Sequence, residues 1–105
     1  MRATTISSGE LVALAGRLDV AGAGVARDAL HEAIPAGSGP LTVDLSEVEL
    51  LDATGLGVLV GAHRRARLQD RELILCDARP RVARLLSLTR LDRVIAVERR
   101  RSVLT

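Results

Sequence analysis

The segment of residues 41–61 constrains the fold more strongly than any other part of this 105-residue chain. Residues 41–45 alternate apolar and polar side chains, which predicts a short buried strand. After a short crossing, the turn Asp52-Ala-Thr-Gly55 leads directly into an apolar helix that we expect to end near Leu68. A strand that passes through a tight turn into a helix is typical of α/β proteins, so we predict the α/β fold class.

The remaining segments extend this pattern into one mixed β-sheet. The hydrophobic periodicity predicts strands at 4–7, 11–15, 41–45, 72–76 and 94–97, and helices at 20–34, from Asp52 to about Leu68, and from Pro80. Asp19 is a candidate N-cap for the first helix. Because the later strands alternate with helices, we expect them to be parallel, while the first two form a hairpin. The prediction is a sheet of about four to five strands with helices packed against it, in a single domain over 1–105 that ends in a flexible basic tail at 99–105.

The composition excludes several classes of protein. Apolar residues make up 48% of the chain but aromatic residues 0%, so the core must be aliphatic and no base-stacking surface is available. The net charge of +2 comes entirely from residues 98–101, so the rest of the chain is formally neutral, which argues against a nucleic-acid-binding protein. The single Cys76 and the isolated His31 and His63 indicate no disulfide, no metal site and no cofactor.

No part of the sequence indicates a membrane span or a targeting segment. The uncharged stretch 53–62 contains three glycines and is far shorter than the ~20 apolar residues that a spanning helix needs. We therefore expect a cytoplasmic protein. Since no second large apolar surface is evident, we also expect a monomer.

Thr54 is the main candidate for chemistry because its hydroxyl falls at the predicted start of a helix. Free N–H groups and the helix dipole favour negative charge at that position, so a phosphate on Thr54 would be tolerated. The simpler interpretation is that Thr54, or Asp52, only caps the helix, since both residue types are common N-caps. The residues of the turn leave both interpretations open.

An enzyme is disfavoured because the partners that catalysis requires are missing. Asp44 and Asp52 could form a pair of carboxylates near the carboxyl edge of the sheet, where α/β proteins bind ligands. However, the chain has no Lys to complete a phosphoryl-transfer site and no His/Cys/Asp cluster for a metal. Gly55-Leu-Gly57 lacks the further glycine and the Lys of known nucleotide loops. A nucleotide-binding domain is retained only as an alternative.

The predicted helix after Asp52 offers a candidate partner-binding surface. Gly57 and Gly61 are four residues apart and mark one helix face with almost no side chain, where a partner backbone can approach closely. Arg64 and Arg65 follow one turn later and rim this face. Together with neighbouring arginines, among them Arg71, they form a basic patch that either complements the helix dipole as a solvated face or faces an acidic partner.

Several motifs, taken in order along the chain, resemble the STAS domain family (sulfate transporter and anti-sigma factor antagonist). They are Gly16-Arg-Leu-Asp19, Val43-Asp-Leu-Ser46, the pattern Asp-x-(Ser/Thr)-Gly-Leu-Gly at 52–57, and Pro80-Arg-Val-Ala-Arg-Leu-Leu with Leu91-Asp92. The resemblance spans nearly the whole chain. It implies a stand-alone anti-sigma factor antagonist with a small mixed sheet.

The resemblance also implies a mechanism. In that family the unphosphorylated protein binds an anti-sigma factor that is also a serine/threonine kinase, which releases the sigma factor. The kinase phosphorylates the hydroxyl that here is Thr54, the complex dissociates, and a phosphatase resets the cycle. The partner surface would comprise Asp52, Ala53, Gly55, Gly57, Gly61, Arg64 and Arg65.

The chain departs from the STAS family pattern at two positions, and the family also offers an alternative function. Ala53 stands where many relatives have a second hydroxyl, so Thr54 is left as the single acceptor. Arg90 stands where the family often has Gly; in a left-handed conformation Arg would cost about 1 kcal/mol. Some STAS proteins act instead as scaffold subunits of a lipid-transport ATPase or a stress-signalling complex, without depending on phosphorylation.

Overall fold

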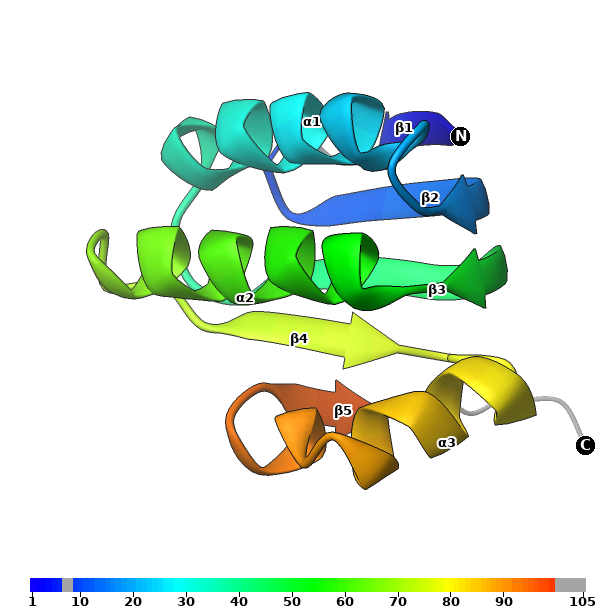
Figure 1. The fold of residues 1–105 in the computed structure, drawn as a ribbon. Helices are drawn as coiled ribbons and strands as arrows, with labels where there is room; N and C mark the ends of the chain where they lie inside the picture. Colours follow the sequence, from blue (N-terminus) through cyan, green and yellow to red (C-terminus); the bar gives the residue numbers. More distant parts are fainter. Residues whose placement is uncertain (7–8, 100–105) are drawn as a thin grey trace, which may run out of the picture.

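The computed structural model describes residues 1–6 and 9–99 as a five-stranded sheet with helices packed against it (Figure 1). The strands are β1 (Arg2–Ile6), β2 (Leu11–Leu18), β3 (Leu41–Leu51), β4 (Leu73–Cys76) and β5 (Ala96–Glu98). The helices are α1 (Ala23–Ala36), α2 (Ala53–Arg67), α3 (Pro80–Leu88) and a short 3₁₀ helix, η1 (Leu91–Arg93). Apart from Arg99, which is exposed, the basic tail predicted at 99–105 lies outside the described residues.

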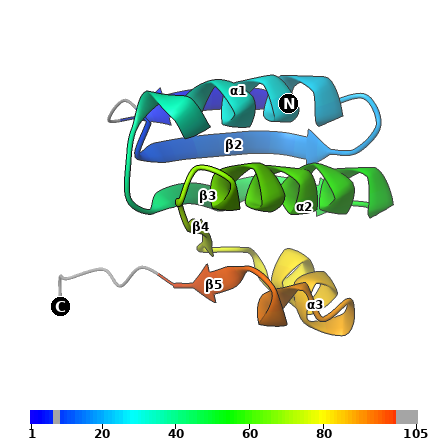
Figure 2. The same ribbon diagram turned by 90° about the vertical axis from the view of Figure 1, so that its left-hand side faces the viewer.

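The sheet is mixed, as predicted. Its order is β1-β2-β3-β4-β5; β1 and β2 are antiparallel, and every other neighbouring pair is parallel. In Figures 1 and 2, α1 and α2 run side by side and in the same direction along the sheet, while α3 lies near β5. This arrangement confirms the predicted α/β, STAS-like class.

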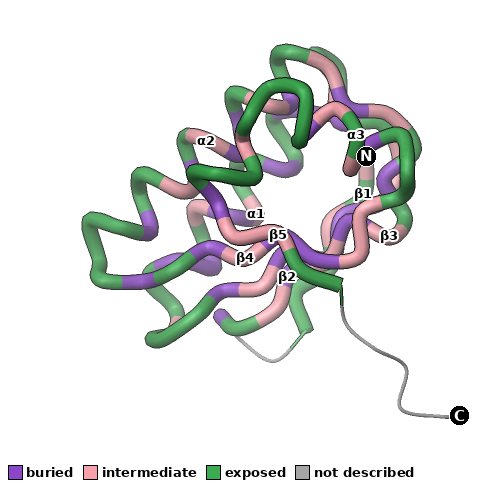
Figure 3. The backbone as a smooth tube through the Cα atoms, turned by 90° about the horizontal axis from the view of Figure 1, so that it is seen from below, coloured by how far each residue is buried: buried purple, intermediate pink, exposed green. Residues whose placement is uncertain are grey.

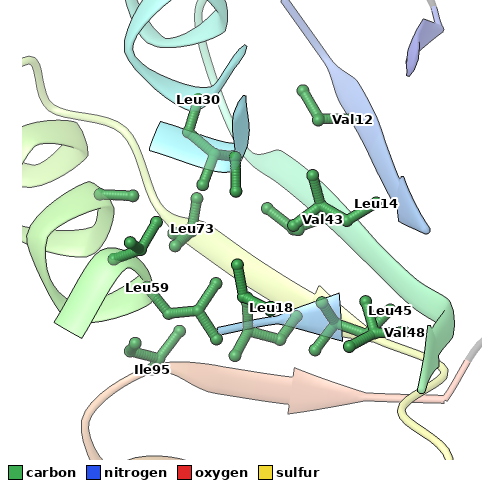
Figure 4. Close-up of a cluster of buried hydrophobic side chains, with 14 of the residues drawn as sticks. Val12, Leu14, Leu18, Leu30, Val43, Leu45, Val48, Leu59, Leu73 and Ile95 are labelled. Carbon is green, nitrogen blue, oxygen red and sulfur yellow. The ribbon is translucent and has the colours of Figure 1, made fainter. Parts of the chain in front are cut away.

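One aliphatic core joins the sheet to all three α-helices. Buried side chains of β2, β3 and β4 alternate in the first half of each strand and lie against Leu30 of α1 and Leu59 of α2 in one cluster (Figure 4). Val82 and Leu86 of α3 belong to the same cluster. The absence of aromatic residues therefore leaves a core of Leu, Val, Ile and Ala, as the composition predicts.

β3 is longer than the sequence suggested. The strand continues to Leu51 with no crossing after residue 45. Its register against β2 shifts twice, between Ala13 and Ala15 and again between Gly16 and Arg17, so β3 contains an extra residue at each place. Each shift changes which side chains face the core, which explains why the buried residues Leu45, Val48 and Leu51 are three apart and do not alternate.

Helix ends also differ from prediction by a few residues. The α1 helix begins at Ala23, later than expected, after a turn in which the Asp19 side chain accepts a hydrogen bond from the Gly22 N–H at 3.1 Å. It continues through Pro35 to Ala36. After α3, Arg90 adopts a left-handed conformation with φ 61° and ψ 20°, so the strain of about 1 kcal/mol considered for a non-glycine residue at this position applies.

Candidate functional site

Asp52 caps α2 and leaves Thr54 free of that role. The Asp52 carboxylate accepts a hydrogen bond from the Gly55 N–H at 3.0 Å, and the Asp52 carbonyl accepts one from the Leu56 N–H at 2.9 Å. Ala53 and Thr54 are exposed in the first turn. Within residues 1–6 and 9–99 the Thr54 hydroxyl makes no hydrogen bond. Of the two caps that the sequence allowed, the structure therefore uses Asp52.

Gly55 fixes this turn against the end of the sheet. The residue is buried, and a Cβ added there would collide with the Leu18 carbonyl oxygen and lie 2.7 Å from the Leu51 side chain. Contacts this short do not occur for real Cβ atoms, so only Gly lets the start of α2 approach β2 this closely. Gly55 therefore supports the Thr54 turn from the core side and is not exposed to a partner.

A groove of about 500 Å³ runs between α1 and α2. We call it the α1–α2 groove; it is lined by Arg27, His31, Thr54, Gly57, Val58, Gly61, Arg64, Arg65 and Leu68. A Cβ added at Gly57 or Gly61 would meet nothing within 4 Å, so the two glycines are open to solvent. Figure 3 shows how exposed and buried residues alternate as α2 turns. Gly57 and Gly61 are both exposed residues of this helix.

The groove brings together five of the eight residues predicted for the site. Thr54, Gly57, Gly61, Arg64 and Arg65 all line it. Asp52, Ala53 and Gly55 do not; they form the turn that positions Thr54 at the start of α2.

Arg27 and His31 are groove residues that the sequence analysis missed. They are four residues apart on α1, so they lie on the same side of that helix. Burial, followed by the charges of Arg65 and Arg27, lowers the pKa of His31 from 6.5, while Asp28 opposes this shift. The i, i+4 spacing was visible in the sequence, but the neighbour that these residues face became apparent only in the fold.

Arg71 does not belong to the exposed basic patch in which the sequence analysis placed it. The residue is only 3% exposed and donates hydrogen bonds to main-chain carbonyls of distant segments. Its Nη2 donates to the Gly9 carbonyl at 2.6 Å, its Nη1 to Ile34 at 2.9 Å and Ala33 at 3.1 Å, and its Nε to Gly39 at 2.8 Å. The cation therefore satisfies the last carbonyls of α1 and ties together three loops at one end of the sheet.

The carboxylate pair considered for catalysis does not form. Asp44 is the fourth residue of the eleven-residue β3, not its last, so roughly 20 Å of extended chain separates it from Asp52. Asp44 lies instead beside Cys76 and Asp77, with possible ligand atoms within 4.8 Å of one another. The Asp44 carboxylate accepts a hydrogen bond from the Ser46 N–H at 2.8 Å, and all three residues have interaction partners.

Among the described residues, no helix is long and apolar enough to cross a membrane.

Fold and site together define a small α/β module with a free hydroxyl at an exposed helix start, beside an open groove. The chain belongs to the STAS domain family: the family model described as "Mlab, STAS domain" matches residues 3–98. This finding confirms the resemblance detected in the sequence motifs.

Known relatives of this chain are regulatory proteins by name. The chain is 35% identical over 86 residues to the anti-sigma-B factor antagonist of Bacillus subtilis, covering 82% of this chain and 78% of that protein. It is 41% identical over 58 residues to the anti-sigma-B factor antagonist of Listeria monocytogenes, where the match spans 55% of this chain but only about half, 51%, of the relative. The solved structure of the anti-sigma factor antagonist SpoIIAA in its unphosphorylated form superposes with a TM-score of 0.69 at 15% identity, covering 97% of this chain and 88% of that one, which supports the fold.

Proposed function

We propose that this protein is an anti-sigma factor antagonist whose binding surface is Thr54 and the exposed side of α2. The observation that carries this proposal is that Asp52, and not Thr54, caps the helix. The exposed Thr54 hydroxyl is therefore not needed to stabilise the turn. The names of the relatives in Bacillus and Listeria give the class of partner, an anti-sigma factor. The protein acts by binding and not as an enzyme, and it works as a cytoplasmic monomer in a single domain without a cofactor.

The partner is an anti-sigma factor that is also a serine/threonine kinase, and Thr54 is its substrate. A phosphate adds about −1.5 to −2 charges at neutral pH. The free N–H groups at the start of α2 stabilise this charge in the free protein, so the fold is preserved. Inside an interface that fits a neutral hydroxyl, the same charge is unfavourable by several kcal/mol, and each 1.4 kcal/mol weakens binding tenfold. Phosphorylation therefore ends the complex, and a phosphatase restores it.

Ala53 makes this switch depend on a single hydroxyl. No second acceptor lies next to Thr54 in the turn, so one substitution removes all phosphorylation there. A kinase that prefers Ser is expected to modify Thr54 slowly.

Affinity capture with variants of Thr54 tests the proposal. Unphosphorylated protein, Thr54→Val and Thr54→Glu are each used as bait, and the captured proteins are identified by mass spectrometry. Thr54→Val keeps the shape of the side chain without an acceptor, so it should retain an anti-sigma factor as well as the wild type does. Thr54→Glu should lose that factor while its thermal unfolding midpoint barely moves. A complex that survives Thr54→Glu would contradict the switch and favour the scaffold function instead.

A further inference from the structure

The α1–α2 groove carries positive charge that no described carboxylate neutralises. Arg27 projects from α1 and Arg64 and Arg65 from α2, and all three line the groove. In the described part of the chain, the ion pairs join Arg17 to Asp19 and Arg79 to Glu47, so none of the three groove arginines is paired. Asp28 of α1 raises the pKa of His31, against the larger lowering effects, but it forms no ion pair with a groove arginine.

Apart from these charges the lining of the groove is mostly apolar. Gly57 and Gly61 contribute no side chain, and Val58 is buried between them. At the far end Leu68 is 85% exposed and adds an apolar side chain to the lining. An occupant that fits must combine negative charge with small apolar side chains.

We propose that this groove binds an acidic segment of the partner protein, whose carboxylates pair with Arg27, Arg64 and Arg65. The inference rests on the proposed function and extends its partner surface from α2 onto α1. Guanidinium groups form two parallel hydrogen bonds with a carboxylate, and three unpaired arginines around one groove provide charge complementarity for such a segment. A nucleic acid fits less well because the rest of the protein is formally neutral and has no aromatic residues for stacking.

This assignment also connects the groove to Thr54. Because Thr54 lines the same groove, its phosphate would add negative charge beside the arginines and compete with an acidic occupant. Phosphorylation would then act through like-charge repulsion across the whole groove and not only through contacts at the hydroxyl.

A titration with a defined acidic peptide tests this proposal without requiring the natural partner. The probe is an amphipathic peptide of Glu, Ala and Leu, roughly 14 residues or about four helical turns long, and the control probe has Gln for every Glu. Isotope-labelled protein is titrated with each probe, and the amide shifts are followed by NMR. The largest shifts are expected at Gly57, Gly61 and His31 with the acidic probe and should be absent with the Gln probe.

Matched variants separate the groove from general charge. Arg27→Gln/Arg65→Gln should weaken binding of the acidic probe by roughly two- to thirtyfold, whereas Arg67→Gln/Arg84→Gln removes the same charge outside the groove and should change it little. Thr54→Glu should also weaken binding of the acidic probe.

Three results would overturn the inference: equal losses in both charge variants, shifts centred on another surface, or tighter binding of a single-stranded oligonucleotide than of the acidic peptide. None of these results bears on the anti-sigma function, which the affinity capture tests separately. Conversely, a failed affinity capture would not change the outcome of the peptide titration.

Discussion

Replacing Gly57 and Gly61 together with Ala should stabilise the free protein and weaken its partner complex. Both glycines lie inside α2, and an added Cβ at either position meets nothing within 4 Å. Gly in a helix interior is about 0.8–1.0 kcal/mol less favourable than Ala, so the double variant should gain about 2 kcal/mol in free energy of unfolding. For a domain of this size, that gain raises the thermal midpoint by roughly 8–15 °C.

The same two methyl groups would stand where the partner approaches. If a partner backbone packs directly on the glycines, forcing methyl groups into that contact is unfavourable by about 1–3 kcal/mol, as in an overpacked core. Affinity for the anti-sigma factor should then fall about five- to 150-fold. Stability and binding move in opposite directions, which a general folding defect cannot imitate.

Circular dichroism during urea unfolding is the assay for stability, because the chain has no aromatic residue whose fluorescence could be followed. Calorimetric titration with the purified anti-sigma factor measures binding. Gly24→Ala is the matched control: Gly24 is also an exposed helical glycine with open space around it, but it lies on α1 outside the groove. A destabilised double variant would contradict the open space found around Gly57 and Gly61. A stabilised double variant with wild-type affinity would show that the two glycines lie outside the interface.

Three further substitutions test the roles of individual residues by urea unfolding. Asp52→Ala should destabilise the protein by about 1 kcal/mol through loss of the cap, while Thr54→Ala should change stability by less than about 0.5 kcal/mol; equal effects would contradict the assignment of the cap. Arg71→Leu should cost more than about 3 kcal/mol, because it leaves several buried carbonyls without donors, and a change below about 1 kcal/mol would contradict that role. Burial and neighbouring arginines lower the pKa of His31 from 6.5, so the unfolded chain binds a proton at His31 more readily than the folded protein does. The stability that neutral His31 contributes is therefore complete above pH 6.5, and it is lost as the pH falls from 6.5 through the folded-state pKa. His31→Gln should therefore lose less stability between pH 7 and pH 5 than the wild type. An equal loss in both proteins would be evidence against a link between His31 protonation and folding.

Local patterns in the sequence were sufficient for the parts of the fold that depend on neighbouring residues. The order of strands and helices follows from alternation and helical spacing, and the turn before α2 limited its cap to Thr54 or Asp52, of which the structure uses Asp52. The length of β3 could not be predicted in this way. Its two extra residues are defined by pairing with β2, so Val48 and Leu51 enter the core at a spacing that resembles no regular strand.

Long-range contacts account for the other differences. In the sequence, Arg71 looks like one more charge at the end of a basic helix, yet the fold brings carbonyls from residues more than 30 positions away around its guanidinium. Arg27 and His31 show the same limitation, because their place in the site depends on α1 packing beside α2. By contrast, Gly57 and Gly61 were predictable, since helical spacing alone places them on one exposed face.

Phosphorylation of the preformed complex shows whether a phosphate on Thr54 releases the anti-sigma factor. The protein and its captured anti-sigma factor are mixed without nucleotide, and Mg²⁺ and ATP are then added while size-exclusion chromatography follows the complex and mass spectrometry follows Thr54. We expect a single phosphate on Thr54 and dissociation in step with it, with Thr54→Val remaining bound throughout. A complex that stays intact with Thr54 fully phosphorylated, or that dissociates equally with Thr54→Val, would contradict it.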